Sequence, residues 1–512
     1  MERVEIVLAL VVLATVVAVS ARRLRLPAPS LLVAAGVAAG LLPFVPRVTV
    51  DPQVVSFVVL PPLLYAAGED LSWRELRRVW RPVTVLAFGL VLASAAAVGA
   101  VAAAVTGLPA AMAFVLGAIL ASTDPVAVTA LGRRLPLPAR VHTLLQGESL
   151  FNDATSLVLF RVAVAGAAAG GAVSWTHAVG LFALLAGGGA AAGAAVAACV
   201  AVIRRRTEDP VLETVIALLT PYVAYVAAEA AHVSGVTAVV VASVILGGLA
   251  PSLTNPGIRL QLHAVYGTVV FLLESVVFAV IGLTLPGFVR DLATAPVHLL
   301  WQVLAVAATL LTVRFLWVAP LALFLADRPR RAAWRAAAVV SWAGARGVLP
   351  LAAALSLPLL TDAGHALPGR GLTITITAAV IVLTLTVQGF TLSPLVRRSG
   401  IAASGAALRA EEALADVRTA HAALARLEEL DRVPPEAHAA LQRALRHRID
   451  EHREPTPEHD SADLSLRAAR RELIAAELRE LDRLHETGEI SDATRRRVQR
   501  TLDLRDSALG EP

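Results

Sequence analysis

The stretch "GESLFNDA", residues 147–154, lies inside a long apolar segment of the chain. It places a carboxylate, a hydroxyl, an amide and a second carboxylate close together: Glu148, Ser149, Asn152 and Asp153. Glu148 and Asn152 are four residues apart, as are Ser149 and Asp153, so on a helix the two pairs occupy adjacent rows of one side. The pattern predicts a helix with a polar, acidic strip in apolar surroundings.

The composition is that of a polytopic membrane protein. Of the 512 residues, 57% are hydrophobic and only 17% are charged, which is more apolar than a soluble domain. All 45 basic residues are arginines. The one cysteine, Cys199, excludes an intramolecular disulfide and disfavours a cysteine-based metal site.

Thirteen stretches are apolar enough to be read as membrane spans. The hydrocarbon core of a bilayer is roughly 30 Å thick, so a helix needs about 18 or more apolar residues to cross it. We therefore predict an all-α transmembrane domain over residues 1–398. The predicted spans are about 4–20, 28–46, 53–68, 82–106, 110–131, 141–169, 177–203, 211–231, 235–251, 264–286, 296–325, 333–358 and 371–395.

Arginines are concentrated in alternate loops between these spans. Because cytoplasmic loops carry an excess of positive charge, the odd-numbered loops are predicted to be cytoplasmic and the N-terminus to lie outside the cell. The odd-numbered loops contain eighteen arginines: Arg22, Arg23, Arg25, Arg74, Arg77, Arg78, Arg81, Arg133, Arg134, Arg140, Arg204, Arg205, Arg206, Arg259, Arg328, Arg330, Arg331 and Arg335. The even-numbered loops contain three: Arg47, Arg290 and Arg370.

Residues 399–512 have a different composition. Residues 1–400 hold 27 Arg against 17 acidic residues, whereas residues 401–512 hold 18 Arg against 23. Stretches such as "EEALADVRTAHAALARLEEL" have helical spacing. We predict a cytoplasmic helical tail that forms a bundle or a dimerisation element, with binding of a regulator as the alternative. Since the positive-inside rule accounts for the basic excess of the membrane part, no nucleic-acid binding is expected.

Two of the predicted spans contain residues that interrupt helices. In "ASTDPVAVT", Pro125 removes a backbone donor and biases Asp124 away from helical angles. The helix is therefore expected to open at Thr123 and Asp124, which frees backbone carbonyls. In "SWAGARGVLP", Gly344, Gly347 and Pro350 permit a second interruption beside Arg346; close packing of the glycines is the alternative.

The positions of these two interruptions predict an inverted repeat. The fifth and twelfth spans are seven spans apart, so they run in opposite directions across the membrane. Two broken helices that face each other at the bilayer midplane are typical of secondary transporters, and they place a substrate site there. The sixth span follows the first interruption directly, which brings Asp153 towards this site.

At this point the chain resembles the NhaP/NHE-type sodium/proton exchangers, a branch of the monovalent cation:proton antiporters that is electroneutral. The motifs that carry the resemblance are "STDPVAV", "GESLFNDA", "YVAAEAAHVSGVTAVVVASVILG" and "FLLESVVFAVIGL". The similarity covers about residues 5–398, and the Asn-Asp pair is its most specific part. The tail ending "GEISDATRRRVQRTLDL" is similar to that of bacterial members.

The resemblance implies a role for each residue of the polar strip. Asp153 would bind either the proton or the cation, so that it is the Na⁺ ligand, and Ser149 and the backbone around Thr123 would supply further oxygen ligands. Asn152 would replace the second aspartate of the electrogenic branch. Asp124 would lie where the broken helices cross and balance their dipoles. Glu148 would pair with an arginine, either Arg314 on the eleventh span or Arg346 in the broken helix.

Other charged residues of the spans have less defined roles. Glu229 and Glu274 match positions of the family, and each is either functional or a structural hydrogen-bond or ion-pair partner. Arg161 is assigned no role. Several relatives carry a glutamate near the ion site where this chain has Ala66, and Glu69, one turn later, is closer to the cytoplasmic arginines. The preference for Na⁺, K⁺ or Li⁺ is therefore open.

The predicted activity is electroneutral Na⁺/H⁺ antiport in the cell membrane, with one cation exchanged for one proton at Asp153 by alternating access. No cofactor is expected, and the resemblance implies a homodimer. K⁺/H⁺ antiport is the alternative, because oxygen ligands suit both ions. An intramembrane hydrolase is disfavoured, since the sequence has neither a Ser/His pair nor an HExxH motif. The third class considered is a membrane-anchored sensor, in which the tail is the functional part.

Overall fold

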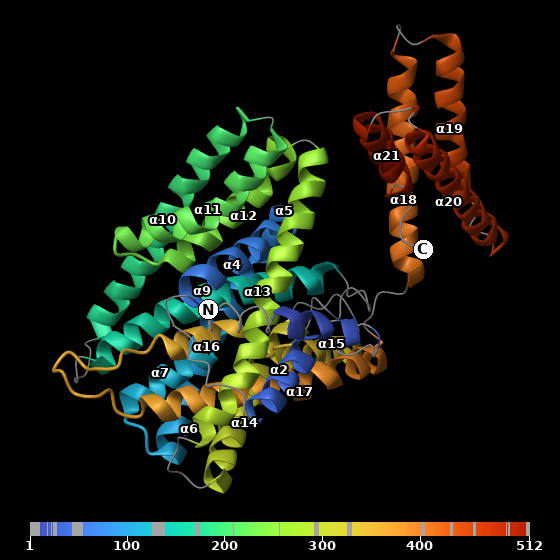
Figure 1. Cartoon of the computed structure of the whole chain (residues 1–512). Coiled ribbons are helices and arrows are strands. Elements are labelled where there is room, and N and C mark those ends of the chain that lie inside the picture. The colour runs from blue at the N-terminus through green and yellow to red at the C-terminus, as the bar shows by residue number, and fades with distance from the viewer. Residues whose placement is uncertain are drawn as a thin grey trace. The chain divides into compact units, whose positions relative to one another are not determined.

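The computed structural model describes most of the chain. The described residues are 11–17, 19–21, 23, 28–42, 55–124, 139–168, 175–207, 209–254, 256–290, 296–324, 330–400, 405–430, 434–453, 457–487, 489 and 492–507. Two compact units are present, Met1–Ala403 and Ser404–Pro512. Among the described residues, the regular structure is helical apart from one antiparallel bridge between Leu360 and Ala366 (Figure 1).

The first unit is a bundle of helices, several of which are joined end to end. α5, η2 and α6 form one continuous helix, and η1 leads directly into α4. The elements up to residue 204 are α2 (Ala28–Gly40), η1 (Val55–Val59), α4 (Leu60–Glu69), α5 (Trp73–Thr84), η2 (Val85–Leu90), α6 (Val91–Thr106), α7 (Ala110–Leu120), α9 (Ala139–Ala168) and α10 (Trp175–Arg204). The remaining elements are α11 (Pro210–Ala230), α12 (Gly235–Leu253), α13 (Pro256–Arg290), α14 (Pro296–Phe324), α15 (Arg330–Trp342), α16 (Val348–Leu355) and α17 (Arg370–Ser399).

Local sequence signals set several helix ends. Asp209 caps α11, because its side chain accepts from the backbone N–H groups of Val211 at 2.7 Å and Leu212 at 3.1 Å. Two other helices are followed by a glycine in the left-handed conformation: Gly107, with φ of 69°, follows α6, and Gly400, with φ of 66°, follows α17. Glycine is favoured there because it has no Cβ to clash in that conformation.

The predicted spans from the second onward overlap these helices, and the polytopic all-α class is confirmed. Within the described residues, seven helices are long and apolar enough to cross a membrane, and shorter apolar helices such as α2 and α7 accompany them. The fourth span is longer than predicted, since its helix begins at Trp73 rather than at residue 82. Residues 4–10 of the first predicted span and 125–131 of the fifth lie outside the described residues.

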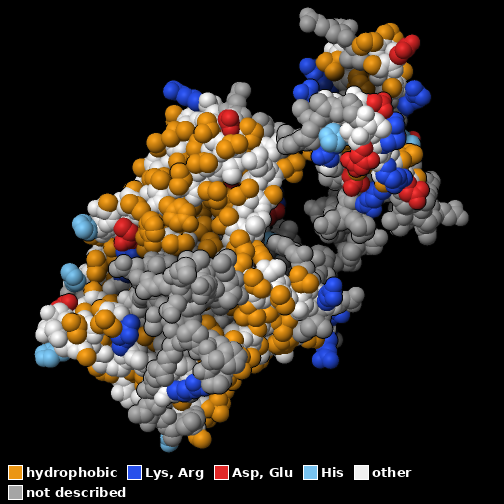
Figure 2. All heavy atoms as spheres, viewed as in Figure 1, with side chains coloured by type: hydrophobic (Ala, Val, Ile, Leu, Met, Phe, Trp, Pro, Cys, Tyr) orange, Lys and Arg blue, Asp and Glu red, His pale blue; other side chains and the backbone are white. Residues whose placement is uncertain are grey.

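The outer surface of the first unit is apolar over broad areas. Figure 2 shows hydrophobic side chains covering much of the visible face of this unit. On α10 and α11 the exposed residues include Val179, Leu184, Val215, Leu219 and Val223. A helix that is apolar on its outward side is suited to contact with lipid, which agrees with a multi-pass membrane protein.

Two groups of helices share the interior of this unit. α2, α4, α10, α11, α12 and α13 pack mainly with one another. α5 to α9 form the second group, which α14 joins through α6 and which α16 and α17 join through α7. The tightest contact is between α2 and α13, where Gly36 and Gly282 lie against backbone of the facing helix and leave no space for a Cβ. Contacts of α9 with α10 and of α13 with α17 connect the two groups.

Two helices of the second group are interrupted where they meet. The α7 helix ends at Leu120, and residues 122–124 have no regular structure. The pair α15 and α16 is separated by the non-helical residues 344–347. The backbone N–H of Asp124 donates to the carbonyl oxygen of Ala345 at 2.8 Å. The segment that follows α7 and the segment between α15 and α16 are therefore hydrogen-bonded to each other.

The second unit consists of paired helices. Its elements are α18 (Gly405–Glu428), α19 (Pro435–Arg453), α20 (Pro457–Glu486) and α21 (Asp492–Ser507). α18 packs on α19, and α20 packs on α21. Arg448 of α19 and Asp416 of α18 form an ion pair at 2.6 Å, while Ala420, Leu427 and Ile449 are buried.

Candidate ion-binding site

The polar strip of α9 lies against the interruption that follows α7. Ser149 donates from Oγ to the carbonyl oxygen of Thr123 at 2.5 Å, and Asn152 donates from Nδ2 to Thr123 Oγ1 at 3.3 Å. Asp153 accepts a hydrogen bond on Oδ1 from the hydroxyl of Ser122. All of these side chains are buried. The open backbone is held in place because the α9 side chains take over partners that a continuous helix would provide.

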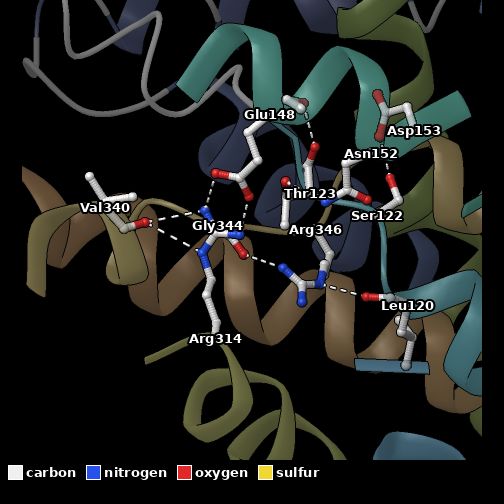
Figure 3. A network of polar contacts seen from close by, with 11 residues as sticks. Leu120, Ser122, Thr123, Glu148, Asn152, Asp153, Arg314, Val340, Gly344 and Arg346 are labelled. Carbon is white, nitrogen blue, oxygen red and sulfur yellow. Dashed lines mark hydrogen bonds and ion pairs between the residues drawn. The ribbon is translucent and has the colours of Figure 1, made fainter. Parts of the chain in front are cut away.

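Glu148 points towards a different partner. Its two carboxylate oxygens accept from Nη1 and Nη2 of Arg314 on α14, and the Nη2 distance is 3.0 Å (Figure 3). Arg314 also donates to the carbonyl oxygen of Val340, from Nη2 at 3.2 Å and from Nε at 3.4 Å. Gly344 permits this arrangement, since a Cβ there would collide with the Arg314 guanidinium.

Arg346, the other arginine considered for Glu148, binds backbone instead. Its Nε donates to the carbonyl oxygen of Leu120 at 2.8 Å, and its Nη1 donates to that of Gly344 at 2.5 Å. Leu120 is the last residue of α7, and Gly344 follows the end of α15. The guanidinium therefore lies at the C-terminal ends of both half-helices, where a positive charge is favourable.

Asp124 lies at the N-terminal end of a helix, α16, and not at a C-terminal end. A Cβ on Gly347 would overlap the Asp124 carboxylate, so the carboxylate is against the backbone of Gly347. Gly347 is the residue that precedes α16, and a negative charge is favourable at a helix N-terminus. Asp124 and Arg346 thus complement the dipoles of the broken helices. The family resemblance implies this role for Asp124, and it stays a prediction.

The remaining charged residues of the prediction lie elsewhere. Glu229 on α11 forms an ion pair at 2.5 Å with Arg161, which follows Asp153 by about two turns of α9. Glu229 also accepts from the backbone N–H of Gly235 at 3.2 Å. Glu274 is half-buried on α13, and its role is still a prediction. The partner of Arg161 is not predictable from local sequence, because Glu229 is 68 residues away along the chain.

Two contacts are not predicted from the sequence. One is the hydrogen bond from Ser122 to Asp153, since the prediction names the neighbouring Thr123 as a ligand. The other is the ion pair of Arg204, which the prediction places in a cytoplasmic loop. Arg204 is in fact the last residue of α10, fully buried and paired at 2.7 Å with Glu213 of α11. The pairing of a basic residue at one helix end with an acidic residue in the first turn of the next helix was the available signal.

An all-helical membrane unit in which two interrupted helices cross beside a buried carboxylate defines a secondary transporter. The chain belongs to the sodium/hydrogen exchanger family: the model described as "Sodium/hydrogen exchanger, transmembrane" matches residues 7–398. This membership places the protein among transporters, in a family of sodium/hydrogen exchangers.

Individual relatives agree with this assignment. An uncharacterised Na⁺/H⁺ exchanger of Mycobacterium tuberculosis is 35% identical over 429 residues, covering 82% of this chain and 78% of the relative. A Bacillus subtilis protein named as a sodium, potassium, lithium and rubidium/H⁺ antiporter is 31% identical over 409 residues, covering 75% of this chain and 60% of the relative. Among solved structures, the sodium proton antiporter MjNhaP1 of Methanocaldococcus jannaschii has the same fold. Its TM-score is 0.63 at 20% identity, covering 78% of this chain and 98% of that structure.

Proposed function

We propose that the protein is an electroneutral Na⁺/H⁺ antiporter in which Asp153 carries either one proton or one Na⁺. The observation that carries this proposal is the charge balance around the crossing helices. Three carboxylates, Asp124, Glu148 and Asp153, face two guanidinium groups, Arg314 and Arg346. With all five ionised, the cluster has a net charge of minus one. One bound proton or one monovalent cation makes it neutral.

This balance leads to obligatory exchange. A buried net charge is costly inside a membrane, so the empty cluster resists the conformational change that moves the site from one side of the membrane to the other. The loaded cluster is neutral whether it holds a proton or a cation. If the site can switch between the two sides of the membrane only when it is neutral, it must return with one ion after releasing the other. Inward movement of one ion is then matched by outward movement of the other.

Asn152 limits the exchange to one charge. Its amide is neutral and lies beside Asp153, where a second carboxylate would raise the charge of the empty cluster to minus two. A cluster of that charge could carry two protons against one cation and would then move net charge. The neutral amide therefore supports a ratio of one to one.

The direct test is transport by purified protein in proteoliposomes, followed with a pH-sensitive dye. Asp153→Asn is expected to abolish Na⁺-dependent proton movement, and wild-type transport should be the same with the membrane potential free or clamped by valinomycin and K⁺. Asn152→Asp, if it still transports, should become sensitive to the clamp. Normal exchange by Asp153→Asn would refute the role of Asp153, and a clamp effect on the wild type would refute electroneutrality.

K⁺/H⁺ exchange at the same site is the second candidate. The observation that favours it is the name of the Bacillus subtilis relative, which includes potassium, lithium and rubidium. The same vesicles loaded in turn with Na⁺, K⁺ and Li⁺ distinguish the two candidates through the apparent KM of each ion.

We further propose the orientation and assembly of the protein. The arginine-rich odd-numbered loops support an N-terminus outside the cell and a cytoplasmic second unit. The family resemblance supports a homodimer. Protease protection of a C-terminal tag in sealed vesicles tests the orientation, and the molar mass of the detergent complex tests the assembly.

A further inference from the structure

Ser122 holds an unusual position among the hydroxyl groups at the break. It is 2% exposed and donates to the Asp153 carboxylate. The neighbouring hydroxyls on α9 serve the backbone: Ser149 donates to the carbonyl of Thr123 at 2.5 Å, and Ser156 donates to that of Ala118 at 2.6 Å. Ser122 is therefore hydrogen-bonded to the acidic group itself, whereas Ser149 and Ser156 are bonded to backbone carbonyls.

A hydroxyl in this position can contact a cation without giving up its hydrogen bond. A serine hydroxyl has one donor and two lone pairs. While the proton is directed at Asp153 Oδ1, a lone pair of Ser122 Oγ is left for an ion next to the carboxylate. Hard cations prefer several oxygen ligands at short distance, and an oxygen that is already hydrogen-bonded to the carboxylate lies within such a distance of the same ion.

Asn152 offers a further oxygen at the same place. Its amide is fixed by the 3.3 Å hydrogen bond from Nδ2 to Thr123 Oγ1, and its side chain is fully buried. None of the described residues donates a hydrogen bond to its Oδ1. Figure 3 shows the side chains of Asn152, Ser122 and Asp153 close together beside the break. A buried amide oxygen without a donor is costly, and a cation would satisfy it.

We propose that the Ser122 hydroxyl is a direct ligand of the transported alkali cation and, with Asp153 and Asn152 Oδ1, sets the affinity and selectivity of the site. This inference rests on the proposed function, because it takes Asp153 as the exchanging carboxylate. It adds Ser122 to the ligands that the family resemblance implies, because of the position of its hydroxyl next to the Asp153 carboxylate. The neutral ligands replace part of the water shell that the ion loses when it enters the site.

The test separates affinity from turnover. Ser122→Ala removes the ligand, and the apparent KM for Na⁺ is expected to rise about tenfold, the size expected for loss of one contact to a charged group, while the maximal rate changes less than KM. Ser122→Thr keeps the hydroxyl and should stay close to the wild type. Ser156→Ala is the matched control, because it deletes a buried serine hydroxyl on the same helix contact without touching Asp153.

A binding measurement gives a second readout that does not depend on transport. A ligand that binds only the folded state stabilises it by RT ln(1 + [L]/Kd), so the stabilisation at a given Na⁺ concentration falls as Kd rises. Addition of NaCl, with choline chloride as the ionic-strength control, should stabilise the wild type and Ser156→Ala in detergent. For Ser122→Ala, the same stabilisation should require about tenfold more Na⁺.

The outcomes decide the inference clearly. An unchanged KM and unchanged Na⁺ stabilisation in Ser122→Ala would overturn it, as would equal losses of maximal rate in Ser122→Ala and Ser156→Ala with KM unaltered. If Ser122→Ala does not accumulate, Ser122→Cys replaces the hard oxygen by sulfur at similar volume, and a wild-type KM there overturns the proposal. Asp153→Asn is measured in parallel: inactivity there with a normal KM in Ser122→Ala rejects only Ser122, whereas activity rejects the proposed function.

Discussion

Replacing Glu148 by glutamine tests the charge balance of the crossing helices most directly. The change keeps the size of the side chain and removes its charge. Arg314 would keep its bonds to the carbonyl oxygen of Val340, at 3.2 and 3.4 Å, but its positive charge would be buried without a counterion. Glu148 and Arg314 are 1% and 3% exposed, so water cannot compensate for the loss.

The expected loss of stability is large. Removing one partner of a buried ion pair costs about 3–5 kcal/mol, and we expect the lower end because the glutamine oxygen can still accept from one guanidinium nitrogen. A second effect concerns transport. With Glu148 neutral, the empty cluster has no net charge and no longer requires a proton or cation for neutrality. Glu148→Gln should therefore lose exchange even where it folds.

The assay is reversible unfolding in mixed micelles of detergent and SDS, followed by tryptophan fluorescence. Trp317 lies one turn from Arg314 on α14 and reports on this region. A double-mutant cycle with Arg314→Gln isolates the pair, and the double variant should lose less than the sum of the single variants. The control is Arg161→Gln, because its pair with Glu229 is about a third exposed and is worth less than about 1 kcal/mol. A loss in Glu148→Gln no larger than in this control, or a coupling below about 0.5 kcal/mol, would refute the reasoning.

Two further predictions concern the backbone crossing and the tail. Gly347→Ala should abolish exchange, since its Cβ would overlap the Asp124 carboxylate, whereas Gly371→Ala, which has open space around it, should exchange normally in the same vesicle assay. Near-normal exchange by Gly347→Ala would show that Asp124 can move without consequence. A chain truncated after residue 403, the boundary of the first unit, should retain Na⁺/H⁺ exchange at least in part. Complete loss of exchange in a folded, correctly inserted truncation would favour the view that the tail is the functional part.

The polar strip of α9 was predictable because its information is local. A spacing of three or four residues places side chains on the same side of a helix whatever surrounds it, so the pattern predicts that Ser149 and Asn152 point to the same side of α9, where both contact Thr123. The break after α7 was similarly local, since Pro125 disfavours helical angles in the residue before it.

The partner of Glu148 could not be chosen from sequence in the same way. Arg314 and Arg346 both lie in predicted spans, and their distances from Glu148 depend on how α14 and α15 pack on α9. The structure decides between them through Gly344, which leaves room for the Arg314 guanidinium. Arg204 adjoins Arg205 and Arg206 in sequence, but the fold places it at the end of α10, where it is buried and paired with Glu213.

The difference between the three carboxylates supports the proposal that Asp153 is the one that exchanges ions. Glu148 is bound by two nitrogens of a guanidinium, and Asp124 lies at the N-terminus of α16. Both are stabilised as anions by positive charge or by a helix dipole. Asp153 accepts from the neutral hydroxyl of Ser122, which balances none of its charge. We therefore expect a bound proton or cation to stabilise Asp153 more than the other two carboxylates, whose charges are already balanced by the ion pair and the helix end.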